Sequence, residues 1–245
     1  MNNALKQRGF NQGLYDTSTV QKEALGTLRI TADGRKFRYA KAGGTVNKGQ
    51  MTLAATVNAN HANEAILAAV PIGTTALELT VTAGTAIAAN QLKDGYLTIQ
   101  DGTGEGQIYL IVGNSAITNA ETVINIALAE PILTALDTTS EFTLCHNPFY
   151  GVTHSATGEQ LATGISLVAV TSGDYFWAQT GGPCVWYNEN GTTAAVGTNM
   201  VVGTTTSGSV TPATSGIDID LPIVGYAWGT AGASLEYTPG FLTID

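Results

Sequence analysis

The feature that most constrains the fold is a rhythm of short apolar runs separated by turn-forming residues, and this rhythm is densest in residues 174–228. Runs rich in aromatic and β-branched residues alternate there with Gly-Gly-Pro, Asn-Gly and Ser-Gly, a pattern typical of antiparallel strands joined by tight turns. All three tryptophans of the chain lie in this stretch. Because large aromatic side chains dominate small β cores, we expect Trp177, Trp186 and Trp228 to be core aromatics.

Within this stretch the pattern predicts individual strands. Tyr175, Trp177 and Gln179 alternate with Phe176 and Ala178 along one strand. We expect the chain to turn at 181–183 and to return as a strand over 185–187. Asn-Gly at 190–191 predicts a tight hairpin turn, and 223–228 a further strand.

The same rhythm runs through the rest of the chain. Residues 28–31 and 37–40 flank Asp33-Gly34 and predict a hairpin. Further strands are expected at 51–57, 76–82, 96–100, 107–112, 122–128, 141–145, 164–170 and 235–244. Residues 18–25 fit either a short helix or an irregular linker, residues 58–70 either a helical turn or extended chain, and 133–136 a single helical turn.

This spacing of strands favours an all-β protein built of two β-sandwich or barrel-like lobes with an extended basic N-terminal arm. We place the arm at residues 1–24, the first lobe at 25–150 and the second at 151–245. The sequence Asn-Pro-Phe-Tyr-Gly at 147–151 is the expected crossing between the lobes.

Charge is unevenly distributed along the chain. Only 12% of the residues are charged, about half the usual quarter. Residues 1–48 hold nine basic and three acidic side chains, a net charge of +6, whereas the remainder holds one basic and sixteen acidic side chains, a net charge of −15. A basic arm on an acidic body is therefore expected. We favour an acidic protein surface as its partner over nucleic acid, because the body is acidic and no nucleic-acid-binding module is visible.

The sequence indicates neither secretion nor insertion into a membrane. The first ten residues have no apolar run, so no signal peptide is predicted. No run of about 18 apolar residues is present, which argues against a transmembrane helix. Cys145 and Cys184 are too few for a disulfide framework, and we expect two reduced, buried thiols.

Several motifs suggest chemistry but fit simpler interpretations better. Asp-Gly-Thr-Gly-Glu-Gly at 101–106 is followed by a strand and not by a helix, which favours a glycine-containing hairpin over a phosphate loop. Cys145, His146 and His154 lack the paired spacing of zinc ligands, so we expect neither metal nor cofactor. Asp218 and Asp220 share one side of a predicted strand and form a weak candidate carboxylate pair. The aromatics around Trp177 and Trp186 could stack on sugar, although core packing is favoured.

Three long stretches resemble a known class of protein. They are ANQLKDGYLTIQDGTGEGQIYLIVGN (89–114), IALAEPILTALDTTSEFTLCHNPFYGV (126–152) and LGTLRITADGRKFRYAKAGGTVNKGQ (25–50), with GDYFWAQTGGP (173–183) and IVGYAW (223–228) further along. Together they resemble virion structural proteins of tailed bacteriophages, particularly marine ones, of the capsid decoration or cement type. The resemblance implies a β-rich, often trimeric protein that binds the outside of a mature head, and it assigns no active site.

We therefore expect a non-enzymatic virion protein, made in the host cytoplasm, that stabilises a phage head by bridging capsid subunits. The expected partners are the major capsid protein and two further copies of the chain, with neither membrane nor nucleic acid. The alternative is a tail-fibre or adhesin module that binds host glycan, and a carbohydrate-active enzyme using Asp218 and Asp220 is a third class. The residues expected to bind the capsid are the basic ones of the arm and first hairpin, namely Lys6, Arg8, Lys22, Arg29, Arg35, Lys36, Arg38 and Lys41.

Overall fold

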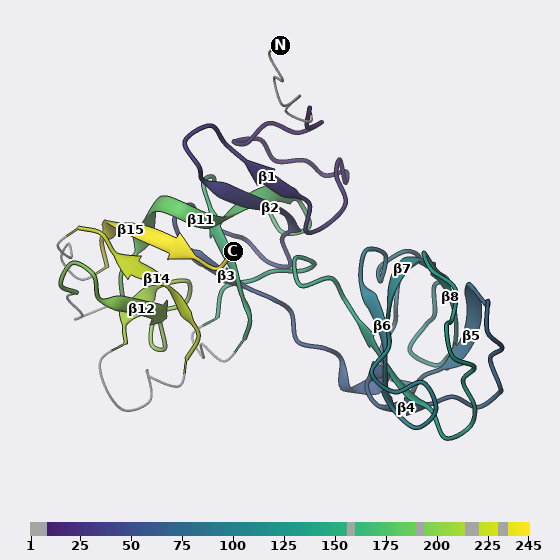
Figure 1. The fold of residues 1–245 in the computed structure, drawn as a ribbon. Coiled ribbons are helices and arrows are strands. Elements are labelled where there is room, and N and C mark those ends of the chain that lie inside the picture. The colour runs from purple at the N-terminus through teal and green to yellow at the C-terminus, as the bar shows by residue number, and fades with distance from the viewer. Residues whose placement is uncertain (1–8, 156–159, 190–193, 214–220, 230–234) are drawn as a thin grey trace, which may run out of the picture. The chain divides into compact units, whose positions relative to one another are not determined.

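The computed structural model describes residues 9–155, 160–189, 194–213, 221–229 and 235–245. The protein is nearly all β, with about 42% of residues in strands, antiparallel sheets and no α-helix in these ranges. The chain forms two compact units, residues 1–55 with 149–245, and residues 56–148 (Figure 1). We call the first the discontinuous unit and the second the inserted unit.

These units do not coincide with the predicted lobes of 25–150 and 151–245. Residues 25–55 belong with the C-terminal half of the chain, because their strands pair there. Strand β2 (Lys36–Lys41) lies beside β11 (Tyr175–Tyr187), and β3 (Met51–Leu53) lies beside β10 (Ala162–Ser166). The chain therefore leaves the discontinuous unit after residue 55 and returns to it at residue 149. The spacing of strands along the sequence does not indicate which distant strands pair. The predicted lobes therefore place residues 25–55 in the wrong unit.

The inserted unit is a six-stranded antiparallel sheet in the order β4-β9-β6-β7-β8-β5, and it curls into a nearly closed, barrel-like form (Figure 1). Near its closure, the Thr82 N–H donates to the Asn60 carbonyl at 3.0 Å. Alternating apolar residues fill the interior. Leu77 and Leu79 lie opposite Ile126 and Ile124, and all four are buried. The elements are β4 (Glu64–Ala65), β5 (Ala76–Thr80), β6 (Tyr96–Asp101), β7 (Ile108–Asn114), β8 (Val123–Leu128), β9 (Glu141–Cys145) and the 3₁₀ turn η1 (Ala59–His61).

The glycine-rich segment at 101–106 is a hairpin joining β6 to β7, as predicted. Gly102 has φ of +72°, and a Cβ there would come within 1.9 Å of the Thr139 carbonyl oxygen. Glycine is required at this position because the neighbouring backbone leaves no space for a side chain.

The discontinuous unit holds a nine-stranded antiparallel sheet in the order β1-β2-β11-β15-β14-β12-β13, with β10 and β3 branching from β11. Its strands not yet given are β1 (Leu28–Ile30), β12 (Asn199–Val202), β13 (Val210–Pro212), β14 (Ile223–Ala227) and β15 (Tyr237–Thr243). The predicted hairpin around Asp33-Gly34 is present as β1 and β2. Asn190-Gly191 lies outside the described residues.

Strand β11 differs most from its prediction, because the expected turn at 181–183 is absent. The strand continues unbroken through thirteen residues and changes partner along its length. Tyr175–Gly181 pairs with β2, and Gly181–Tyr187 pairs with β15. A register shift between Gln179 and Gly181 marks the change, and Gly182 has φ of +85° there. The glycines therefore serve a bulge in a long strand, which resembles a turn in sequence.

Of the three segments with a helical alternative, residues 58–70 contain the 3₁₀ turn η1, and the other two form no helical turn. Residues 18–25 take the irregular alternative, and Ser18 forms an isolated bridge with Tyr175. Residues 133–136 form a bend followed by a bridge, in which Val70 and Leu136 pair antiparallel with reciprocal backbone hydrogen bonds of 2.9 Å. In both cases pairing with a distant segment replaces the local helical turn.

Candidate functional site

The discontinuous unit exposes an apolar, largely aromatic surface on one side of β11, β15 and β14. The strand register brings its residues together: Pro183 lies opposite Phe241, Phe241 opposite Tyr226, and Val185 opposite Pro239. Side chains of directly paired residues point to the same side of a sheet. Trp228 joins this set just after β14, where its N–H donates to the Pro239 carbonyl at 3.3 Å. We call this surface the aromatic face, comprising Pro183, Val185, Tyr226, Trp228, Tyr237, Pro239 and Phe241.

The other side of the same three strands is core. Trp186, Val224 and Leu242 are buried, and so is Gly240. A Cβ on Gly240 would come within 2.4 Å of the Trp186 ring, so this tryptophan lies directly against the β15 backbone. The strands therefore separate a packed side from a side that is apolar yet faces solvent. Apolar side chains grouped on an exposed surface are a mark of interaction sites.

The three tryptophans do not share one environment, which corrects the prediction. Trp177 and Trp186 are each 1% exposed, as expected for core aromatics. Trp228 is 58% exposed and belongs to the aromatic face. Trp177 and Trp186 are therefore too buried to stack on a sugar. The tryptophan that faces solvent is Trp228.

A hollow of about 670 Å³ includes much of the aromatic face. Five of the seven face residues line it, namely Pro183, Val185, Trp228, Tyr237 and Pro239, and Arg35 and Lys48 line it from two turns. This volume is in the usual range for ligand pockets, roughly 300–1,000 Å³. The lining combines aromatic and aliphatic side chains with a few charged ones.

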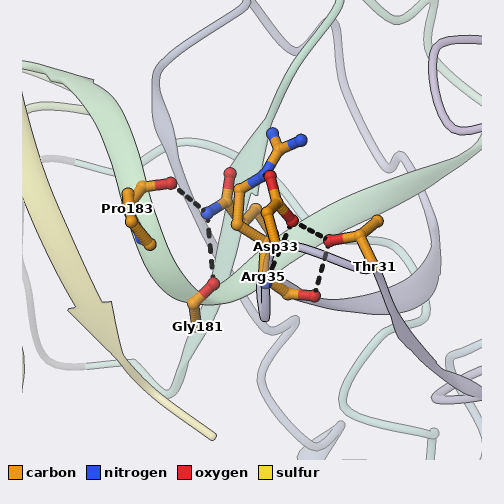
Figure 2. Close-up of polar contacts among 6 residues, drawn as sticks. Thr31, Asp33, Arg35, Gly181 and Pro183 are labelled. Atoms are coloured by element: carbon orange, nitrogen blue, oxygen red, sulfur yellow. Dashed lines mark hydrogen bonds and ion pairs between the residues drawn. The ribbon is translucent and has the colours of Figure 1, made fainter.

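Polar contacts at the hollow hold the β1–β2 turn and the bulge of β11 (Figure 2). The Thr31 hydroxyl donates to Asp33, and the Arg35 Nε donates to the other Asp33 oxygen at 2.8 Å. The hydrogen bond from Thr31, followed by that from Arg35, lowers the pKa of Asp33. Asp33 therefore stays a carboxylate over the neutral range.

The Gln179 side chain hydrogen-bonds to the β11 backbone beside the first residue of β2, where the pairing between these two strands stops. Its amide nitrogen donates to the carbonyls of Gly181 at 3.1 Å and Pro183 at 2.7 Å. The amide oxygen is buried and has no hydrogen-bond partner. Gln179 is also one of the residues that line the hollow.

Most of the predicted capsid-binding cations have partners within the chain. Arg38 donates to both carboxylate oxygens of Asp245, at 2.6 and 3.0 Å, and the Lys36 ammonium donates to the Asp245 carbonyl at 3.1 Å. Arg29 lies over the rings of Phe10 and Trp177.

The remaining cations vary in environment. Arg35 pairs with Asp33, and the Lys41 ammonium lies over the rings of Tyr150 and Tyr175. Lys22 is exposed. Lys6 and Arg8 lie outside the described residues. The role of all eight basic residues in binding a capsid therefore stays a prediction.

The described part of the predicted arm, residues 9–24, packs on the discontinuous unit. Phe10 meets Trp177 edge to face with ring centroids 5.0 Å apart. Gln12 is buried and accepts a hydrogen bond of 2.6 Å from the Tyr39 hydroxyl, and its carbonyl accepts one of 3.2 Å from the Trp177 indole. This segment covers two core aromatics, so it is part of the folded unit.

The inserted unit has an exposed apolar surface of its own, along a ribbon formed by residues 66–74 and 132–140. Backbone hydrogen bonds join the two strips: Gly73 donates to Ile132 at 2.9 Å, and Ile66 donates to Ser140 at 2.9 Å. Leu67, Ile72 and Leu133 are each about two-thirds exposed on this ribbon, at 66%, 68% and 69%. We call it the apolar ribbon.

The candidate chemical residues do not assemble into a reactive site in the part of the chain that is described. No group of three or more His, Cys, Asp or Glu side chains there is placed to hold a metal ion. Both cysteines are free thiols, and burial raises the pKa of Cys184 to about 12. Burial lowers the pKa of His61, His146 and His154. Asp218 and Asp220 lie outside the described ranges.

Comparison with known proteins gives no relative from which a function could be carried over: no family model, curated protein or solved structure matches the chain. In the described ranges, no helix is long and apolar enough to cross a membrane. The resemblance to phage virion proteins consequently stays a prediction from the sequence.

Sequence reasoning missed both exposed surfaces. A usable signal for the aromatic face lies in β15, where Tyr237, Pro239 and Phe241 alternate with Thr238, Gly240 and Leu242. The exposed side of this strand carries apolar and aromatic residues, which differs from the usual polar residues on the exposed side of a strand.

Proposed function

We propose that the protein is a structural virion protein of a tailed phage, which binds the outer surface of the head and stabilises it by bridging capsid subunits. In this proposal it acts as a decoration protein, without catalysis, and assembles as a homotrimer. It is made in the host cytoplasm and ends on the virion. The sequence resemblance supports this role.

The structural observation that supports the proposal is that the chain has two β units, each with its own hydrophobic core and its own exposed apolar surface. The aromatic face belongs to the discontinuous unit and the apolar ribbon to the inserted unit. A protein that bridges needs at least two contact surfaces on rigid bodies. Two weak contacts on one chain also reinforce each other, because the second forms at high effective concentration.

The composition of both surfaces suits protein partners. Tyrosine and tryptophan are enriched at the centres of protein interfaces, where they contribute much of the binding free energy. The aromatic face supplies Tyr226, Trp228 and Tyr237, and the apolar ribbon supplies aliphatic side chains. Arg35 and Lys48 add positive charge beside the aromatic face.

A second candidate function is favoured by Trp228. An exposed tryptophan beside Tyr237 and the Asp33–Arg35 pair is also suited to a sugar ring, whose apolar side stacks and whose hydroxyls form hydrogen bonds. This is the adhesin alternative, with the proposed sugar contact at Trp228 in place of Trp177 and Trp186.

The location of the chain on purified virions tests the proposal and separates these two functions. We expect antibody labelling and mass-spectrometric quantification to find many copies per particle, on the head. A few copies confined to the tail would contradict decoration and favour the adhesin. Absence from purified particles would reject both.

A further inference from the structure

We propose that the aromatic face is the surface through which copies of this chain associate with one another. The inference deepens the proposed function and rests on it only for its biological purpose, since the contact itself is argued from the face. Its residues form rows across three adjacent strands, the longest being Pro183, Phe241 and Tyr226. A row of this kind presents a broad, continuous surface.

The breadth of the face favours a macromolecular partner over a small ligand. Five of the seven face residues line the hollow, but Tyr226 and Phe241 lie outside its lining and are each 43% exposed. A sugar bound in the hollow would leave these two rings in water. A partner with its own extended surface would cover them, and apolar sheet faces commonly pack on one another at about 10 Å.

Charge identifies a second copy as the occupant. The chain carries a formal net charge of −9, so two copies repel over most orientations. All seven residues of the aromatic face are uncharged, and contact through them brings no carboxylates of the face together. Association between acidic chains therefore costs least at this surface.

The margin of the face carries both signs of charge. Arg35 and Lys48 line the hollow together with Asp33. A margin with both signs of charge can attract the margin of a neighbouring copy, around a three-fold axis as well as a two-fold one. The hollow of one copy has room for a protruding side chain of the neighbouring copy.

The test is the mass of the full-length protein in solution, measured by sedimentation and light scattering from micromolar to hundreds of micromolar. The face variant carries Trp228→Ser and Phe241→Ser, two exposed positions. The matched control carries Leu67→Ser and Ile72→Ser, which remove comparably exposed apolar side chains from the inserted unit. Thermal unfolding of each variant confirms that both still fold.

We expect the wild-type mass to exceed one chain of 25.3 kDa and the control to match it. The face variant should associate at least about tenfold more weakly, because central aromatics dominate contact free energies. A wild-type monomer over the whole range would overturn the inference and leave the face to a capsid or glycan partner. So would an oligomer that the control disrupts and the face variant does not. Head binding is measured separately, and it can succeed when self-association fails.

Discussion

Individual residues of similar type have opposite roles in this chain, and the tryptophans show it most clearly. Trp186 lies against Gly240 in the core, whereas Trp228 stands on the solvent side of the same sheet. Their difference follows from strand register, because neighbouring positions on a strand face opposite sides. The residue type alone does not indicate whether a tryptophan lies on the buried or the exposed side of the sheet.

The two tryptophans predict a sharp contrast in stability. Trp186→Ala should lower the free energy of unfolding by about 3–5 kcal/mol, the usual range for truncating a buried large aromatic. Trp228→Ala should change it by less than about 0.5 kcal/mol, as for most surface substitutions. Chemical denaturation under conditions where the protein is monomeric measures both. Equal losses would show that Trp228 is covered within the chain.

At the scale of elements, the segment of residues 9–24 is the least expected. Residues 1–24 are predicted from the sequence to form an extended arm, yet Phe10 and Gln12 contact Trp177 and Tyr39. Phe10 and Leu14 are partly buried against the same core cluster. Removing this segment would expose aromatic surface and break buried hydrogen bonds.

Two truncations separate folding from attachment at the N-terminus. Deleting residues 1–24 should destabilise the discontinuous unit by at least about 2 kcal/mol, because partly buried apolar side chains and buried hydrogen bonds are lost. Deleting only residues 1–8 keeps the described contacts of residues 9–24 and removes Lys6 and Arg8. If these cations help to attach the protein, the shorter deletion should weaken head binding at low salt and much less at high salt, where exposed charges are screened. Unchanged stability of the longer truncation would contradict the packing described here.

Much of the element list follows from the sequence, but the partners of the elements do not. Turn formers such as Asp33-Gly34 and the glycines at 102–106 lie between strands where predicted. The glycines of β11 were misread because a bulge and a turn both favour positive φ. The insertion of residues 56–148 was missed because β2 and β11 are separated by more than a hundred residues. Side-chain patterns specify a strand locally, whereas its neighbours depend on the whole chain.

The candidate surfaces were missed for a related reason. Apolar residues at 67, 72 and 133 look like core positions in the sequence, and only the structure shows that they are exposed along the ribbon. The predicted basic site was easier to read from charge, but Arg38 and Lys36 are engaged with Asp245. The Arg38 hydrogen bonds also lower the pKa of the Asp245 side chain, so this contact persists through the neutral range.

At the scale of the whole molecule, the protein consists of two units, and each has its own core and an exposed apolar surface. One core lies inside the barrel-like sheet of the inserted unit, and the others lie in the discontinuous unit. Bridging requires that the two units bind different partners. If one surface holds the capsid and the other holds a neighbouring copy, the bound copies link capsid subunits.

The most direct test of bridging is the temperature at which purified heads rupture and release their DNA. We predict that heads lacking the protein rupture at a higher temperature once the wild-type chain is added. A variant with Leu67→Ser, Ile72→Ser and Leu133→Ser on the apolar ribbon, and one with Trp228→Ser and Phe241→Ser on the aromatic face, should each lose this protection. No shift with the wild-type chain, or full protection by both variants, would contradict the account.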